Sequence, residues 1–171
     1  GRIRVSTGAT AMGQGLQTAM MQIVADHLGA DPGNIDIHLG DTAEPYGFGG
    51  FNSRQTVVAG ASADAAARAV RRKVLSVAAH TLGVEARALD IAGDLVVETG
   101  GGNRSLTLAE VAVAAQGIAG FRLPGIDTPG LQATERVVID DMAYSNGCAV
   151  AEVEVDRATG GVRVTRLAFA H

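Results

Sequence analysis

The sequence contains no tryptophan, only two tyrosines and a single cysteine, Cys148. One cysteine allows no internal disulfide, which excludes a disulfide-stapled framework as the source of stability. The thiol lies in an apolar, strand-like run, so we expect it to be buried and inert. The scarcity of aromatic rings and a formal net charge of -4 argue against a nucleic-acid-binding surface, because such surfaces need a basic face and stacking rings.

Long apolar runs are also missing from the sequence. No segment reaches the roughly 20 residues that a membrane span requires, and the N-terminus has no signal-peptide pattern. We therefore expect a soluble protein in the cytoplasm without a membrane span. The chain has 171 residues, of which 47% are hydrophobic, enough to bury a core. It starts and stops inside strand-like alternation, so we interpret it as a segment of a longer polypeptide.

Two stretches of helical periodicity each follow a glycine-rich loop. Apolar residues recur every three or four positions over residues 16–28, directly after the loop formed by Gly13, Gln14 and Gly15. The loop of residues 45–50 precedes an Ala-rich helix predicted over residues 55–82. The small residues of this helix would let another backbone pack closely: Gly60, Ala61, Ala65 and Ala69. Its basic cluster favours a solvated helix face over a binding patch: Arg68, Arg71, Arg72 and Lys73.

Alternating apolar residues predict strands in several places, above all near the C-terminus. These are residues 35–39, 131–139, 148–156 and 162–170. The pair Gly93-Asp94 is typical of a hairpin turn, and residues 157–161 are typical of a turn that joins the last two strands into an antiparallel hairpin. Thr107 and Glu110 form a capping-box pattern that opens a short helix. Because the closing strands are consecutive, the pattern favours an α+β fold over a doubly wound parallel sheet.

The two glycine-rich loops share one design, in which glycines and polar side chains precede a helix. The first amides of a helix lack intrahelical partners and carry partial positive charge, so a loop without bulky side chains lets an anion approach closely. A purely structural turn explains either loop alone equally well. Two such helix starts aimed at one place would instead suit an extended, polyanionic ligand.

Several motifs in a fixed order resemble the large, molybdopterin-binding subunit of the molybdenum hydroxylases. This family includes xanthine dehydrogenase, aldehyde oxidoreductases and the aerobic carbon monoxide dehydrogenase. The matching motifs are the Gly-Gln-Gly loop, "GDT" at residues 40–42, "PYGFGGFNSRQT" and the hairpin "VAEVEVDRATGGVRV". The resemblance implies that residues 1–171 are part of one molybdopterin-binding domain, and it allows a sub-boundary near residues 100–130.

The resemblance further implies that this segment holds part of a cofactor cradle. The residues that would contact the cofactor are Met12, Gly13, Gln14, Gly15, Asn52, Ser53, Arg54 and Gln55. In bacterial members of the family the molybdenum-bearing molybdopterin usually carries a cytosine nucleotide, while FAD and 2Fe-2S centres belong to partner subunits or domains. In enzymes of the family the catalytic base is a glutamate in a Gly-Glu motif, and no part of this sequence matches that motif. We therefore expect no catalytic residue and no metal ligand in this segment.

What the resemblance implies about function concerns the longer parent. The parent is expected to be an oxidoreductase that hydroxylates an electron-poor carbon, as in an aldehyde or an N-heterocycle, with water as the oxygen source. The isolated chain is expected to be inactive. Its expected partners are the rest of the large subunit, flavin and iron-sulfur subunits and a small-molecule substrate. The motifs specify neither the substrate, nor the electron acceptor, nor the oligomeric state.

Two alternatives stay open from the residues. The chain could be a non-catalytic structural domain, with Gln14 and Arg54 facing solvent or core, or a binding module for another anionic nucleotide. Arg54 is ambiguous because an arginine at a helix start opposes the helix dipole unless an anion or a carboxylate, such as Glu44 or Asp41, offsets it. If the two loops share a ligand, they lie within about 15 Å of each other.

Overall fold

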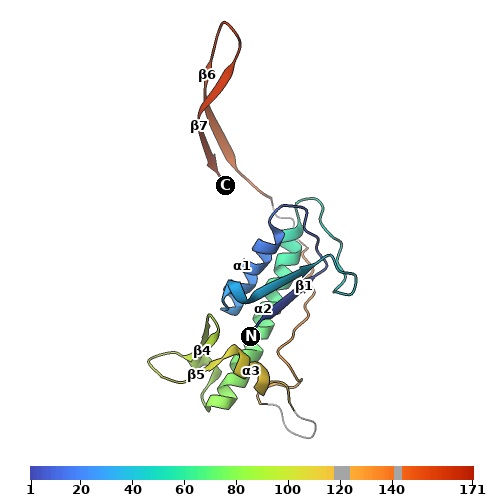
Figure 1. The fold of residues 1–171 in the computed structure, drawn as a ribbon, viewed down its shortest axis with the longest axis vertical. Helices are drawn as coiled ribbons and strands as arrows, with labels where there is room; N and C mark the ends of the chain where they lie inside the picture. The colour runs from blue at the N-terminus through green and yellow to red at the C-terminus, as the bar shows by residue number, and fades with distance from the viewer. Residues whose placement is uncertain (118–123, 141–143) are drawn as a thin grey trace. The chain divides into compact units, whose positions relative to one another are not determined.

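The computed structural model describes residues 1–117, 124–140 and 144–171. The chain divides into two compact units, Gly1–Val138 and Ile139–His171, and Figure 1 labels several of their elements. The predicted α+β fold is confirmed, with mixed helices and strands and a C-terminal antiparallel hairpin. None of the helices in the described part of the chain is long and apolar enough to cross a membrane.

The first unit begins with a strand, a helix and a second strand. Strand β1 (Ile3–Thr7) is followed by helix α1 (Leu16–Leu28), the 3-10 turn η1 (Pro32–Asn34) and strand β2 (Ile35–Leu39). The two strands pair in parallel, with Ile3 opposite Ile35, because the helix carries the chain back to the starting edge. The helix and the second strand predicted here are both confirmed. Because α1 follows β1 in the chain, the glycine loop before α1 begins at the carboxyl end of β1.

Helix α2 (Gln55–Leu82) packs along α1. A Cβ atom on Gly60 would lie 3.1 Å from Cδ1 of Ile23 in α1, so the missing side chain lets the two helices approach. The helical bounds are confirmed, but the predicted small face is partly wrong. Gly60 and Ala69 are buried as predicted, and Ala63 and Ala67 are buried with them, whereas Ala61 and Ala65 are only half-buried.

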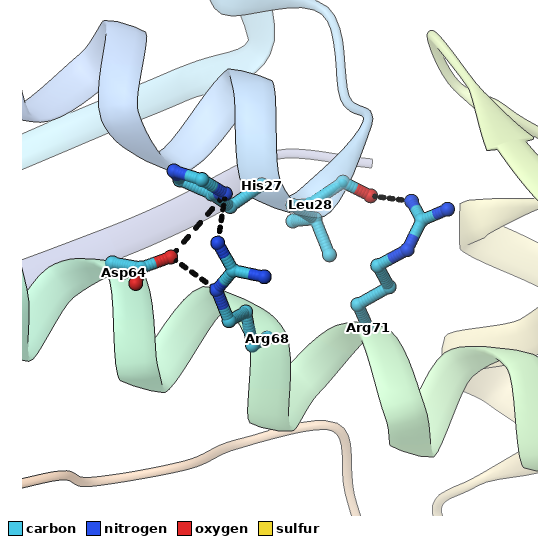
Figure 2. A network of polar contacts seen from close by, with 5 residues as sticks. All are labelled: His27, Leu28, Asp64, Arg68 and Arg71. Carbon is cyan, nitrogen blue, oxygen red and sulfur yellow. Dashed lines mark hydrogen bonds and ion pairs between the residues drawn. The ribbon is translucent and has the colours of Figure 1, made fainter.

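The basic cluster of α2 does more than face solvent. As Figure 2 shows, Arg68 Nε donates to Asp64 Oδ1 at 2.6 Å, and Arg68 Nη2 lies 2.9 Å from Nδ1 of His27 in the last turn of α1. Arg71 Nη1 donates to the carbonyl oxygen of Leu28 at 2.9 Å. Cations near the last carbonyls of a helix are favoured by its dipole. These arginines therefore tie α2 to the C-terminal end of α1.

A small antiparallel sheet follows, made of β3 (Leu89–Ala92), β4 (Leu95–Glu98) and β5 (Ser105–Thr107), with the turn η2 (Ala86–Ala88) before it. The hairpin at Gly93-Asp94 is confirmed, while β5 was not predicted because three residues carry too little periodicity. Helix α3 (Leu108–Ala114) has the predicted capping box: Glu110 N donates to Thr107 Oγ1 at 3.1 Å, and Thr107 N donates to Glu110 Oε2 at 2.7 Å. Side chains of α2, β4 and α3 share one core: Val77, Val96 and Val111.

The strand predicted over residues 131–139 is wrong, because residues 131–140 have no regular secondary structure. Apolar alternation is necessary for a half-buried strand, but a strand also needs a neighbouring edge to complete its hydrogen bonds. This segment is instead held by other contacts: Lys73 Nζ donates to the carbonyl oxygen of Gln132 at 2.6 Å, and Leu131 packs against the core.

The second unit contains the predicted hairpin, formed by β6 (Cys148–Val155) and β7 (Val162–Ala170). The strands pair antiparallel from Val155 opposite Val162 at the turn to Cys148 opposite Ala170. The expectation that Cys148 is buried is wrong in this chain, since the residue is exposed. A two-stranded hairpin has no second layer within its own unit under which a thiol could be buried.

Candidate functional site

Two glutamines join the two glycine-rich loops. Gln14 Nε2 donates to Gln55 Oε1, and Gln55 Nε2 donates to the carbonyl oxygen of Thr10 at 2.8 Å. Gln14 Oε1 accepts from the backbone N–H of Met12 at 2.6 Å. Gln55 is only 8% exposed, so this amide is fixed by its partners rather than by solvent. The expectation that the two loops lie together is confirmed, because they share a direct hydrogen bond.

The helices that start at these loops have no side-chain caps. Gly15 is the N-cap residue of α1 and Arg54 that of α2. Glycine has no side chain and the arginine guanidinium has no acceptor, so neither helix has a side-chain cap, and neither first turn contains an acidic residue. The start of α3 differs, since Thr107 and Glu110 cap it fully. Uncapped first-turn N–H groups and the helix dipole together favour an anionic ligand. Both loops of the candidate site therefore keep free donors.

Backbone conformation at both loops is unusual. Gly13 and Gly15 have φ angles of +89° and +75°, and beyond their immediate chain neighbours no heavy atom lies within 4 Å of the place where a Cβ would stand on either residue. Asn52 and Ser53 both have φ of +53°, a left-handed conformation that costs a residue with a side chain about 1–3 kcal/mol. Strain of this kind concentrates at ligand sites. The first loop thus has open space beside its glycines, and the second loop has a strained turn at Asn52 and Ser53.

Glycines also bring the second loop against the end of β1. A Cβ on Gly8 would stand 2.5 Å from Gly47 Cα and 2.6 Å from the carbonyl oxygen of Pro45. A Cβ on Gly50 would collide with the Gln55 amide and stand 2.9 Å from Cε of Met12. Sequence reasoning missed Gly8, for which the only signal is a glycine directly after a predicted strand. The close approach fixes the second loop beside the glutamine pair.

Glu44 anchors the same loop to β1 from its other end. Its carboxylate forms an ion pair with Arg4, and hydrogen bonding from Ser6 and then from Arg4 lowers the pKa of Glu44 below its usual value. A carboxylate held in its charged form by such partners is a poor general base near neutral pH. Glu44 therefore acts as an anchor of the loop rather than as a catalytic group.

Arg54 does not use either carboxylate that was considered as its partner. Glu44 pairs with Arg4, and Asp41 Oδ1 accepts from the backbone N–H of Ala43 at 2.9 Å. The Arg54 guanidinium instead lies over the ring of Phe51, with 4.4 Å between Cζ and the ring centroid. Arg54 also lines a cavity of about 960 Å³ beside β1 and α2. Arg54 forms no ion pair with any of the described residues.

The Glu44 ion pair is expected to contribute to stability in a pH-dependent way. Because its pKa is lowered from 4.5 in the folded chain, the ionised form contributes stability above the unfolded value, and this contribution is lost as the pH falls through the folded pKa. We expect Glu44→Gln to unfold at a lower temperature than the parent at about pH 7, and the difference to shrink below about pH 4.5. Thermal unfolding at several pH values measures this, and a difference that is constant across the range would contradict it.

The candidate site offers side-chain amides and backbone N–H groups to a ligand rather than metal ligands. No group of three or more His, Cys, Asp or Glu side chains in residues 1–117, 124–140 and 144–171 is placed to hold a metal ion. The Gln14 and Gln55 amides meet in a direct hydrogen bond at the starts of the two helices, and Arg54, the residue before Gln55, lies over Phe51. Donors of this kind fit oxygen-rich, anionic ligands.

Comparison with known proteins places the whole chain in one family. The sequence model of the family described as "Molybdopterin cofactor-binding domain" matches residues 1–171. The chain is 37% identical to the 6-hydroxypseudooxynicotine dehydrogenase complex subunit gamma of Paenarthrobacter nicotinovorans, over 97% of this chain and 21% of that protein. It is also 37% identical to the carbon monoxide dehydrogenase large chain of Hydrogenophaga pseudoflava, over 93% of this chain and 19% of that protein.

A solved structure has the same fold over nearly the whole of this chain. Reconstituted CO dehydrogenase from Oligotropha carboxidovorans matches with a TM-score of 0.81 and 31% identity, covering 99% of this chain and 21% of the other. The chain therefore spans about a fifth of the length of the relatives it matches.

Proposed function

Because the chain belongs to the molybdopterin cofactor-binding domain family, we propose that it is the segment of a molybdenum hydroxylase large subunit in which two helix N-termini hold the cofactor. The observation that carries this proposal is the Gln14–Gln55 hydrogen bond, which brings two uncapped helix starts together. The alternative of a non-catalytic structural domain, with Gln14 and Arg54 facing solvent or core, is not favoured, because the whole chain matches the cofactor-binding family and Gln14 bonds directly to Gln55.

Each part of the cradle has a separate task in this proposal. Gly13 and Gly15 leave the space into which the flat pyranopterin fits, and the Gln14 amide with the first N–H groups of α1 donates to its oxygens. Asn52 and Ser53, with the first N–H groups of α2, face phosphate oxygens, whose charge Arg54 offsets. Met12 packs at the edge of the site. The cofactor itself supplies the metal-centred redox chemistry.

Finer features of the parent are part of the same proposal. The phosphate-directed donors of the second loop suit the cytosine dinucleotide form, which has a pyrophosphate. Two relatives are called the gamma subunit of a complex and a large chain, which supports partner subunits, and we propose that these carry the flavin and 2Fe-2S centres. We propose a hydroxylase activity on an electron-poor carbon for the assembled parent, located in the cytoplasm, with residues 1–171 as part of one cofactor-binding domain.

The Gln14 amide provides the direct test of this function. In the full-length parent, Gln14→Ala is expected to lose about 1 to 3 kcal/mol of hydrogen bonding and to leave a partly occupied enzyme. Molybdenum is measured by elemental analysis, and the nucleotide released on denaturation is identified by chromatography. Gln22→Ala is the matched control, because Gln22 is exposed on α1. Normal molybdenum content and activity in both Gln14→Ala and Gly15→Val would mean that the first loop is only a structural turn.

A further inference from the structure

The side-chain amides of Gln14 and Gln55 belong to a hydrogen-bond chain that begins and ends on the backbone of the first loop. At one end the N–H of Met12 donates to Gln14 Oε1 at 2.6 Å. Gln14 Nε2 then donates to Gln55 Oε1, and Gln55 Nε2 donates to the carbonyl oxygen of Thr10 at 2.8 Å. Because Gln55 is the first residue of α2, its side chain reaches back from the second helix to the first loop.

The two backbone groups allow only one orientation of each amide. A backbone N–H can only donate and a carbonyl oxygen can only accept, so the oxygen of Gln14 faces Met12 and the nitrogen of Gln55 faces Thr10. The remaining atoms then meet as donor and acceptor. A flipped Gln14 amide would place its NH2 group against the Met12 N–H and its oxygen against that of Gln55. Gln55 therefore helps to fix the direction in which the Gln14 amide points.

Burial gives the two amides different tasks. Gln55 is 8% exposed, and the backbone of Gly50 lies against its amide, since a Cβ on Gly50 would stand 2.0 Å from Gln55 Nε2. Gln14 is exposed. Among the described residues its Nε2 makes one hydrogen bond, so its second N–H remains for a ligand. Gln14 can thus donate to a ligand, whereas the side chain of Gln55 is covered.

We propose that Gln55 is a positioning residue, whose side chain holds the Gln14 amide in the orientation that presents its second N–H to the cofactor. The inference rests on the proposed function, in which Gln14 donates to the cofactor. The side chain of Gln55 does not contact the cofactor, while its backbone N–H stays among the first-turn donors of α2. Because the Gln14 amide is ordered before the ligand arrives, binding does not have to order it. Pre-organisation of one side chain is worth about two- to tenfold in affinity.

A double-mutant cycle in the full-length subunit distinguishes positioning from general support. The measured quantity is the rate at which the purified holoprotein loses molybdenum during dialysis, followed by elemental analysis. We expect Gln55→Met to raise this rate about tenfold and Gln14→Ala to raise it at least as much. In the Gln14→Ala background, Gln55→Met is expected to add less than about twofold, because a positioning residue acts only through the amide that it positions. Gln22→Met is the matched control, because Gln22 is exposed on α1, and it is expected to keep the parent rate.

Gln55→Glu provides a rescue that a loss of general support would not show. A protonated carboxyl group can donate to Thr10 and accept from Gln14, as the amide does, whereas a carboxylate can only accept. Burial raises the pKa of a carboxyl group, and the charged groups that line the same cavity, among them Glu44 and Arg54, are also present in Gln55→Met. We expect Gln55→Glu to lose molybdenum as fast as Gln55→Met at about pH 8 and several-fold more slowly at about pH 5. Each rate is divided by that of the parent at the same pH.

Three results would overturn the inference: a parent-like rate in Gln55→Met, an effect that multiplies with that of Gln14→Ala, or rates of Gln55→Glu that do not change with pH. If Gln55→Met does not accumulate, Gly50→Ala replaces it, because the added Cβ displaces the Gln55 amide and leaves its hydrogen-bonding groups intact. Fast loss in Gln14→Ala with a parent-like Gln55→Met refutes the positioning role alone. Parent-like rates in both Gln14→Ala and Gly15→Val refute the cofactor role of the first loop and, with it, this inference.

Discussion

Gly15→Val in the full-length parent is expected to leave a folded subunit with molybdenum occupancy at least about tenfold lower than that of the parent, a change of about 1.4 kcal/mol or more. Gly15 is the N-cap residue of α1 with φ of +75°, and beyond its immediate chain neighbours no heavy atom lies within 4 Å of its would-be Cβ. The protein itself therefore has room for a side chain. A β-branched group there would fill the space that the cofactor needs. Elemental analysis of the purified subunit measures the effect.

A second glycine serves as the control that distinguishes backbone strain from steric blocking of the cofactor. Gly83 is the C-cap residue of α2, with φ of +65° and nothing within 4 Å of its would-be Cβ. Gly83→Val imposes a similar left-handed strain at the opposite end of α2 from the site. We expect it to lower the melting temperature about as much as Gly15→Val does while keeping the metal. Equal loss of metal in both variants would assign the effect to strain, and full occupancy in Gly15→Val would place the cofactor elsewhere.

Gly8→Ala is expected to destabilise the subunit by about 3 kcal/mol, at the upper end for an overpacked site. Gly8 does not have a left-handed backbone conformation, so alanine meets no conformational penalty there. Its Cβ would, however, stand 2.5 Å from Gly47 Cα and 2.6 Å from the carbonyl oxygen of Pro45. Backbone atoms cannot move aside as a flexible side chain does, so the second loop must leave β1. Denaturant unfolding gives the free energy, and protease cleavage within residues 45–50 reports the displaced loop.

The control for this prediction is Gly33→Ala in η1. Gly33 also has an ordinary backbone conformation, and its would-be Cβ meets only the Asp31 carboxylate, at 3.3 Å. We expect a change within about 0.5 kcal/mol, as for most surface substitutions. If Gly8→Ala matched Gly33→Ala in stability and protease resistance, the loop would not be packed against β1. Because Gly50 brings the same loop onto Gln55, we also expect Gly8→Ala to lower the molybdenum content.

Local features of this protein were predictable from the sequence. The bounds of α2 and β7, the turn at Gly93-Asp94 and the capping box of Thr107 and Glu110 all match the structure. Each depends on residues a few positions apart, through helix periodicity, strand alternation or turn geometry. The resemblance at the family level was also recoverable, because its motifs are short segments in a fixed order, and the family is confirmed over residues 1–171.

Pairings between distant segments were decided only by the tertiary structure. Residues 131–139 alternate as a strand does but have no partner edge and form none, and Cys148 lies in an apolar run but stays exposed. The approach of Gly8 to Gly47 and the hydrogen bond from Gln14 to Gln55 join positions about forty residues apart. The physical reason is that burial and hydrogen-bond partners are properties of two surfaces, and a local pattern describes only one of them.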